Sequence, residues 1–316
     1  MHMIKSSGIH HITAICGPAK QNFDFYTQVL GLRFIKKTVN FDDPSTYHFY
    51  YGDESGSAGT ILTFFPWEGA ARGKPGAGEV VAITFEIPKG SIAYWSQRLS
   101  SKNVVFAVDA KAAKPIIAFH DPDGMALEFV EAESADDHLG WGLGGVPAEH
   151  AIRGFAGATM LVGALEKTAK VLTDVFGWSE QTRSTAHGFT RVRFAAPGEE
   201  KFGQHVDLLT HSDLEIANAG AGSVHHIAFR AASDADQAEM VKAAAALGIR
   251  ATDQKDRNYF RAVYFREPSG ILFEIATDAP GFTVDEPLAT LGQALKLPKQ
   301  FEPHRAKIEA VLVKLD

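Results

Sequence analysis

Short apolar stretches alternate with amphipathic segments in an order that recurs along the whole chain. Residues 9–15 form an apolar run typical of a buried strand, and a segment with apolar residues at helical spacing follows it. The pattern predicts helices over residues 21–30, 91–100, 165–176 and 235–247, and a glycine follows three of them, where it readily ends a helix. Three more short strands, separated by Gly, Pro and Asp, follow each helix. The predicted unit is therefore βαβββ, repeated four times.

The repeat can be read directly from the residues. GAGEVVAITFEI (residues 76–87) resembles GAGSVHHIAFRA (220–231), and PDGMALEFV (122–130) resembles PSGILFEIA (268–276) at almost the same separation. Such self-similarity marks a repeated architecture. We therefore expect an N-terminal half, residues 1–150, and a C-terminal half, residues 151–316, with two modules in each. Residues 303–315 lie beyond the last module, and we expect them to form a closing helix.

The bulk composition limits the classes of function. The chain has 316 residues, of which 45% are hydrophobic and 22% charged, as expected of a soluble globular protein. A net charge of −7 disfavours nucleic acid as a partner, because phosphate binding needs a basic face. No apolar run is long enough for a transmembrane helix, and the single cysteine, Cys16, excludes an intrachain disulfide. We expect a cytoplasmic protein without membrane partners and leave homo-oligomer formation open.

Paired histidines distinguish two of the four modules from the other two. The first strands of modules one and four carry these pairs, whereas modules two and three have small or apolar residues there: His10–His11 and His225–His226 against Val81–Ala82 and Ala156–Gly157. The fold therefore does not require the histidines. A lone buried histidine is more often a core residue than a ligand, but two pairs at corresponding places favour a metal site.

One member of each pair is predicted to face the metal, because successive side chains on a strand point to opposite faces. We assign His11 and His226 to the inner face and add Glu274 from the last strand of module four. Two imidazoles and one carboxylate form the set that holds Fe(II) with open positions. Modules one and four must then share one cup, or two chains must exchange halves.

The corresponding positions of the other modules carry weaker ligands. Thr63 aligns with Glu274, and because it is a poor ligand it leaves more coordination positions free, which favours an oxygenase over an isomerase. Glu128 also aligns with Glu274, but its module has no histidine at the matching place. We interpret Glu128, together with Asp207, as a structural remnant and expect a single metal site.

Five stretches in order carry a resemblance to a known family. They are GIHHITAI, YHFYYGDESGSAGTILTFFPW, VHHIAF, DRNYFRAVYFREPSGILFEIA and DEPLATLGQALKLPKQFEPHR. The chain resembles the vicinal oxygen chelate superfamily of glyoxalase I, bleomycin-resistance proteins and extradiol dioxygenases. Within it, the chain is similar over nearly its whole length to para-hydroquinone 1,2-dioxygenases. The resemblance implies an α+β fold, in which four βαβββ modules form two cupped mixed sheets.

The resemblance also implies a ligand set and a substrate site. The metal, Fe(II) or alternatively Mn(II), falls on His11, His226 and Glu274, and the substrate contacts fall on His10, Thr13, His225, Arg257 and Tyr264. Arg257 would hold the negative charge of a diolate, and Tyr264 would donate to a bound oxygen. The proton-transfer residue stays open among His10, His225 and Tyr264, with a slight preference for His225.

These observations lead to a prediction and two rivals. The predicted function is ring cleavage of a hydroquinone-type or catechol-type aromatic diol with O2, without an organic cofactor. One rival is a metal-dependent isomerase or thiol transferase of the glyoxalase type, against which Thr63 argues. The other is a protein that binds quinones or drugs without turnover.

Overall fold

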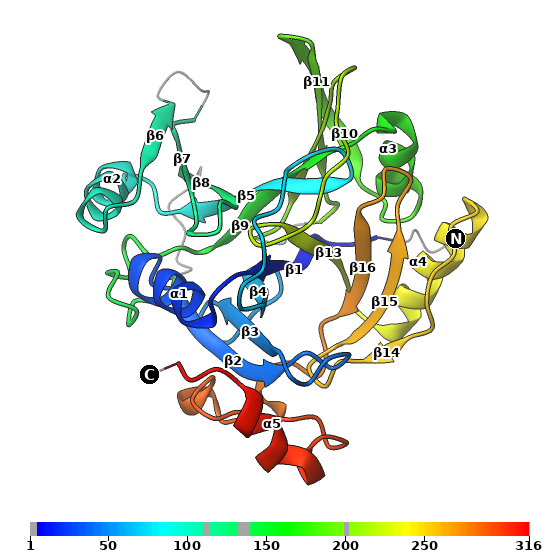
Figure 1. Ribbon diagram of the computed structural model, residues 1–316. Coiled ribbons are helices and arrows are strands. Elements are labelled where there is room, and N and C mark those ends of the chain that lie inside the picture. The colour runs from blue at the N-terminus through cyan, green and yellow to red at the C-terminus, as the bar shows by residue number, and fades with distance from the viewer. Residues whose placement is uncertain (1–4, 110–113, 132–139, 199–201, 316) are drawn as a thin grey trace.

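Two eight-stranded mixed sheets make up most of the molecule (Figure 1). This computed structural model describes residues 5–109, 114–131, 140–198 and 202–315. The strand order of the first sheet is β14-β15-β16-β13-β1-β4-β3-β2, and that of the second is β10-β11-β12-β9-β5-β8-β7-β6. Modules one and four therefore share a sheet, as do modules two and three. This confirms the predicted pairing of modules and the α+β class.

Each module consists of a strand, a helix and three strands. The first sheet comprises β1 (Ile9–Cys16), β2 (Arg33–Val39), β3 (Tyr47–Gly52), β4 (Ile61–Pro66), β13 (Val224–Ala231), β14 (Lys255–Asp256), β15 (Arg261–Arg266) and β16 (Leu272–Thr277). The second comprises β5 (Glu79–Ile87), β6 (Phe106–Asp109), β7 (Ile116–His120), β8 (Ala126–Glu131), β9 (Gly154–Leu161), β10 (Ser179–Ala186), β11 (Phe189–Ala195) and β12 (His205–Thr210).

The helices lie where the apolar spacing predicts them, with two differences. They are α1 (Ala19–Asp24), α2 (Ile92–Ser101), α3 (Leu165–Asp174), α4 (Asp234–Ala246) and α5 (Arg305–Val311). After α1 the backbone widens into a π-helical turn, Phe25–Val29, which closes with a hydrogen bond from Leu30 to Phe25. None of these helices in the described ranges is long and apolar enough to cross a membrane.

The predicted closing helix over residues 303–315 is wrong in its extent. A 3₁₀ turn, Glu302–His304, precedes α5, so the α-helix begins at Arg305. The chain is extended again at Leu312, which packs with Val39 in a small apolar cluster. Burial of this side chain therefore ends the helix early.

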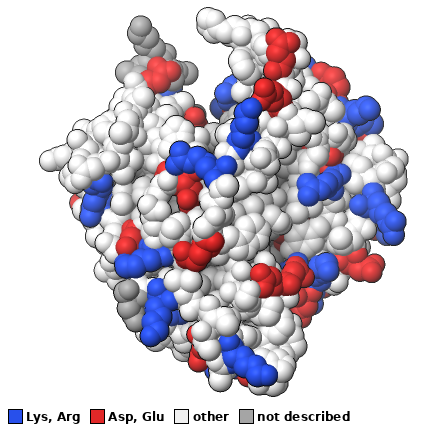
Figure 2. Space-filling view, viewed as in Figure 1, with Lys and Arg blue, Asp and Glu red and all other residues white. Residues whose placement is uncertain are grey.

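The core joins the two sheets. One cluster of buried apolar side chains includes residues from both, such as Ile12, Phe85, Phe155 and Phe229. Positive and negative side chains are interspersed over the face of the molecule that Figure 2 shows, and no broad basic region lies on that face. The two sheets are therefore joined by apolar packing.

The C-terminal tail is held against β2 by a buried lysine. Lys36 has no exposed surface, and its Nζ lies 2.6 Å from both Asp285 Oδ1 and Glu286 Oε2. The same ammonium lies 5.0 Å from the centre of the Tyr259 ring. Glu286 is itself 4% exposed. This ion pair therefore fastens the tail to the edge of the first sheet (Figure 1).

Removal of the buried ammonium is expected to destabilise the fold. Lys36→Met should lower the free energy of unfolding by about 3–5 kcal/mol, because it leaves Glu286 buried and unpaired. Lys20→Met is the matched control, since Lys20 pairs with Asp24 on the surface and should contribute below about 0.5 kcal/mol. Urea denaturation measures both. Equal effects of the two substitutions would contradict this account.

Candidate metal centre

Two neighbouring strands at the centre of the first sheet bring His11 and His226 together. β1 and β13 run antiparallel with Ile12 opposite Ile227. Because side chains alternate along a strand, His11 and His226 project from the same face. Their Nε2 atoms lie 3.4 Å apart. The pair therefore depends on the register of this one strand contact.

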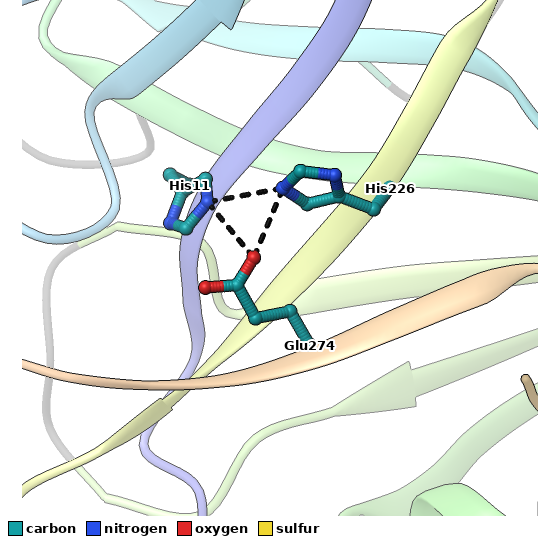
Figure 3. Close-up of side chains that lie close together, drawn as sticks. All are labelled: His11, His226 and Glu274. Carbon is teal, nitrogen blue, oxygen red and sulfur yellow. Dashed lines mark hydrogen bonds and ion pairs between the residues drawn. The ribbon is translucent and has the colours of Figure 1, made fainter. Parts of the chain in front are cut away.

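Glu274 completes the cluster from β16, which runs parallel to β13 with Glu274 opposite Ala228. Its Oε2 lies 2.9 Å from His226 Nε2 and 3.4 Å from His11 Nε2 (Figure 3). All three side chains are buried, and within the described ranges they form the one converging group of histidine, cysteine or carboxylate ligands. The structure thus brings the three predicted metal ligands to one point.

Each candidate histidine ligand is held at Nδ1 by the other histidine of its pair. His10 Nδ1 lies 2.9 Å from His11 Nδ1, and His225 Nδ1 lies 2.8 Å from His226 Nδ1. Burial, and then the neighbouring ring, lower the pKa of His10 to about 3 and of His225 to about 4, so both are neutral at pH 7. A neutral imidazole has one N–H. Because Nδ1 is engaged by the neighbouring ring, Nε2 of His11 and of His226 is the atom directed at Glu274, and it can bind a metal when it carries no proton.

Three atoms that can bind a metal therefore meet at one buried point. Among the described residues, neither Glu274 oxygen has a hydrogen-bond partner, although the side chain is fully buried. Burial raises the pKa of Glu274, but His11 and His226 lower it more strongly, so the carboxylate is charged. A buried charge is costly unless a cation compensates it. Two imidazoles and a carboxylate fit a divalent ion such as Fe(II).

Thr63 occupies the position predicted for it. It lies opposite Thr13 in the β1–β4 pair, just as Glu274 lies opposite Ala228 in the β13–β16 pair. The Thr63 hydroxyl donates to Thr13 Oγ1 at 2.8 Å. This corner of the cup therefore supplies no carboxylate.

The second sheet repeats the frame with different side chains. Glu128 accepts a hydrogen bond from Thr84 at 2.7 Å, and Asp207 pairs with the guanidinium groups of Arg191 and Arg193, each at 2.7 Å. A Cβ added at Gly157 would lie 2.5 Å from the His205 carbonyl oxygen, so no histidine fits there without a backbone shift. These contacts agree with the prediction that Glu128 and Asp207 are structural.

A cavity of about 350 Å³ opens beside the three candidate ligands, and most of its walls are aromatic. Of the five predicted substrate contacts, His225, Arg257 and Tyr264 line this cavity. Thr13 is instead fully buried at the hydroxyl of Thr63, and His10 lines a second cavity. The structure therefore brings three of the five to the space next to the metal ligands.

Arg257 and Tyr264 act as a connected pair in the cavity wall. Arg257 Nε donates to the Tyr264 hydroxyl at 3.1 Å, and another nitrogen of the same guanidinium lies 3.2 Å from Asp42. Burial, and then Glu274, raise the pKa of Tyr264 well above its usual value, so the phenol is neutral. Because its oxygen accepts from Arg257, its own O–H proton can be donated into the cavity.

The sequence interpretation missed the wall formed by β3 and β4. The His48 ring lies 4.4 Å from that of Phe65, and Phe65 stacks with Trp67 at an interplanar angle of 18°. His48 Nδ1 also accepts from the Tyr50 hydroxyl at 2.9 Å. The available signal was the alternation of His48 and Tyr50 on one strand, because alternate residues share a face.

Paired βαβββ modules around a buried cluster of two histidines and a carboxylate define a class of metal-binding proteins with a cupped sheet. Residues 8–129 and 154–275 match the model of the Glyoxalase/Bleomycin resistance protein/Dioxygenase superfamily. The chain belongs to this superfamily.

Relatives narrow the comparison. The chain is 45% identical to a proposed ring-cleaving dioxygenase of Bacillus subtilis, MhqO, over 98% of this chain and 96% of the relative. It is 32% identical to a chlorohydroquinone/hydroquinone 1,2-dioxygenase of Sphingobium indicum, over 93% of this chain and 92% of the relative.

Solved structures agree on the fold. A proposed dioxygenase from Bacillus subtilis, 45% identical, superposes with a TM-score of 0.91 and covers 99% of this chain and 98% of its own. Glyoxalase I from Zea mays, 15% identical, gives 0.64 over 86% of this chain and 92% of its own, a likeness of fold alone.

The two corresponding carboxylates give a matched test of the metal site. Glu274→Gln should weaken Fe(II) binding by more than about a hundredfold, since loss of a group that only orients a ligand already costs 10–100-fold. Glu128→Gln, at the corresponding place in the second sheet, should leave the metal content unchanged. Metal analysis after anaerobic loading, with circular dichroism to check folding, measures both. Similar metal content in the two variants would refute the assignment.

Proposed function

We propose that the protein is a non-haem, metal-dependent dioxygenase that opens hydroquinone-type aromatic diols with O2 by extradiol-type cleavage, in the cytoplasm. The observation that carries the proposal is the convergence of His11, His226 and Glu274 beside an aromatic cavity of about 350 Å³. The similarity to a chlorohydroquinone/hydroquinone 1,2-dioxygenase over almost the whole chain supports the substrate class. Catechol-type diols are the alternative substrates.

The proposed metal is Fe(II), with Mn(II) as the alternative. A bound Fe(II) would supply Lewis acidity toward a phenolic oxygen and redox capacity toward dioxygen. His11 comes from residues 1–150, and His226 and Glu274 come from residues 151–316. We therefore propose that both halves of the chain are required to hold it.

The aromatic wall suits a flat ring. His48, Phe65 and Trp67 lie along one side of the cavity, and Phe260 lies 4.9 Å from the ring of His11. Aromatic faces attract another ring in offset or edge-on contact and exclude water from it. The diol would thus be oriented by packing before its oxygen atoms are engaged.

Polar groups around the cavity can manage the charge of the diol. Arg257 would hold the negative charge of a diolate oxygen, and Tyr264 would donate its O–H to a neighbouring oxygen. His225 Nδ1 lies 2.8 Å from His226 Nδ1, and when it accepts a hydrogen bond there its Nε2 carries the proton. In this tautomer His225 is a second donor to an oxygen in the cavity, consistent with a role in proton transfer.

Oxygen uptake tests the reaction. The Fe(II)-loaded protein should consume dioxygen and methylhydroquinone in equimolar amounts, because both oxygen atoms enter the ring-opened product. Protein treated with a chelator is the control and should consume none. If the loaded protein consumes no dioxygen with any hydroquinone or catechol but isomerises a hemithioacetal, the glyoxalase-type rival is correct. A protein that neither holds metal nor turns over would be the binding protein.

Tyr264→Phe separates catalysis from metal binding. The change removes one donor to the developing oxygen charge, so kcat should fall about 10²-fold while Fe(II) content is unchanged. Tyr94→Phe is the control, because Tyr94 lies on α2 and stacks on His150 away from the cavity. Steady-state oxygen uptake and metal analysis provide the two readouts. Unchanged kcat in Tyr264→Phe would remove this residue from the mechanism.

A further inference from the structure

Module one fills the corner opposite Glu274 with a chain of hydrogen-bonded side chains. The Tyr50 hydroxyl donates to His48 Nδ1 at 2.9 Å, and His48 Nε2 lies 2.9 Å from Thr63 Oγ1. Thr63 in turn donates to Thr13 at 2.8 Å. His48 and Tyr50 line the cavity, whereas Thr63 and Thr13 have no exposed surface.

The protons of this chain can be assigned from its ends. Thr63 gives its proton to Thr13, so Thr63 Oγ1 accepts from His48 Nε2–H. A neutral ring has one N–H, so His48 Nδ1 accepts from the Tyr50 hydroxyl. Burial lowers the pKa of His48 well below its usual value, so the ring is neutral and has this one N–H. Both ring nitrogens are therefore occupied, and neither offers a lone pair to a metal.

The equivalent positions of module four show what the hydrogen-bonded side chains of module one replace. Tyr264 lies opposite Glu274 as Tyr50 lies opposite Thr63, and two residues earlier on the strand Ala262 stands where module one has His48. Module four thus combines a small residue with a carboxylate that reaches the other two ligands. Module one combines an imidazole with a short hydroxyl that the imidazole engages.

We infer that His48 is a positioning residue that, held by Tyr50, engages Thr63 and prevents module one from supplying a fourth protein ligand to the metal. This inference rests on the proposed metal site, but not on the proposed reaction. Its consequence is that a carboxylate at position 63 would not by itself reach the metal, because the His48 ring, held by Tyr50, would still engage it.

The test converts module one into the pattern of module four. Thr63→Glu alone should leave metal binding unchanged, because His48 Nε2–H pairs with the new carboxylate and holds it away. Thr63→Glu combined with His48→Ala frees that carboxylate and gives it the volume of the lost ring. The double variant should bind Mn(II) more than about tenfold tighter, since an added charged ligand raises affinity. It should also lose about one exchangeable water, since the ligand occupies one of the ion's octahedral positions.

Two measurements on Mn(II)-loaded protein give the readouts. Electron paramagnetic resonance titration yields the dissociation constant, and water-proton relaxation yields the number of exchangeable waters on the ion. His48→Ala alone and Thr63→Gln with His48→Ala are matched controls, which open the same space without adding a charged ligand. Both should resemble the wild type in the dissociation constant for Mn(II) and in the number of exchangeable waters. The comparison of the Glu and Gln double variants stands even if Thr63→Glu alone does not fold.

The outcomes separate this inference from the site on which it rests. Wild-type protein that binds no Mn(II) or Fe(II) would overturn the proposed site together with the inference. If the wild type binds metal, and Thr63→Glu alone already binds it more tightly and loses a water, then His48 does not hold the residue at position 63 away from the metal. If the Glu and Gln double variants bind alike, this corner is not a coordination position. Either of the last two results overturns the inference and leaves the proposed function standing.

Discussion

The antiparallel contact between β1 and β13 is the constraint on which the site depends. It joins the first module to the last, and its register places His11 and His226 on one face within 3.4 Å of each other. A shift of one strand by one residue would place His11 and His226 on opposite faces of the sheet, because strand side chains alternate. β16 pairs in parallel with β13, and the register of this pair places Glu274 beside the two histidines. The candidate metal site therefore depends on strand register.

The two sheets solve the same electrostatic problem in different ways. Each sheet carries a carboxylate that is almost completely buried, Glu274 in the first sheet and Asp207 in the second. Asp207 is balanced by two guanidinium groups of the protein itself. Glu274 has two imidazoles beside it and, in the part of the chain that the structure describes, no arginine or lysine, so a bound cation would balance its charge. One scaffold thus carries a structural ion pair and a site for a dissociable ion.

The sequence was sufficient for the frame and for the cluster of two histidines and one glutamate. Comparison of repeats separates residues that the fold needs from those that one copy has added, which is why His11, His226 and Glu274 could be predicted together. The comparison could not place Thr13 or His10 relative to the cavity. The alternation of side chains on a strand shows which face of the sheet a residue lies on, but not how deeply it is buried. His48 was missed because a single histidine on a strand carries no repeat signal, and its role depends on Tyr50 and Thr63. Helix ends at the tail depend on burial of Leu312, which no local pattern reveals.

The pairing of the first module with the last also bears on synthesis of the chain. While only the N-terminal half has left the ribosome, β1 has β4 on one side and nothing on the other, and β5 likewise has only β8. Such open strand edges are templates for pairing with other chains. A neighbouring nascent chain could offer its own β13 and β9 in the same registers, and the result would be an exchanged dimer with two complete cups. Correct assembly thus requires that the chain's own second half pairs with its first half before the second half of a neighbouring chain does.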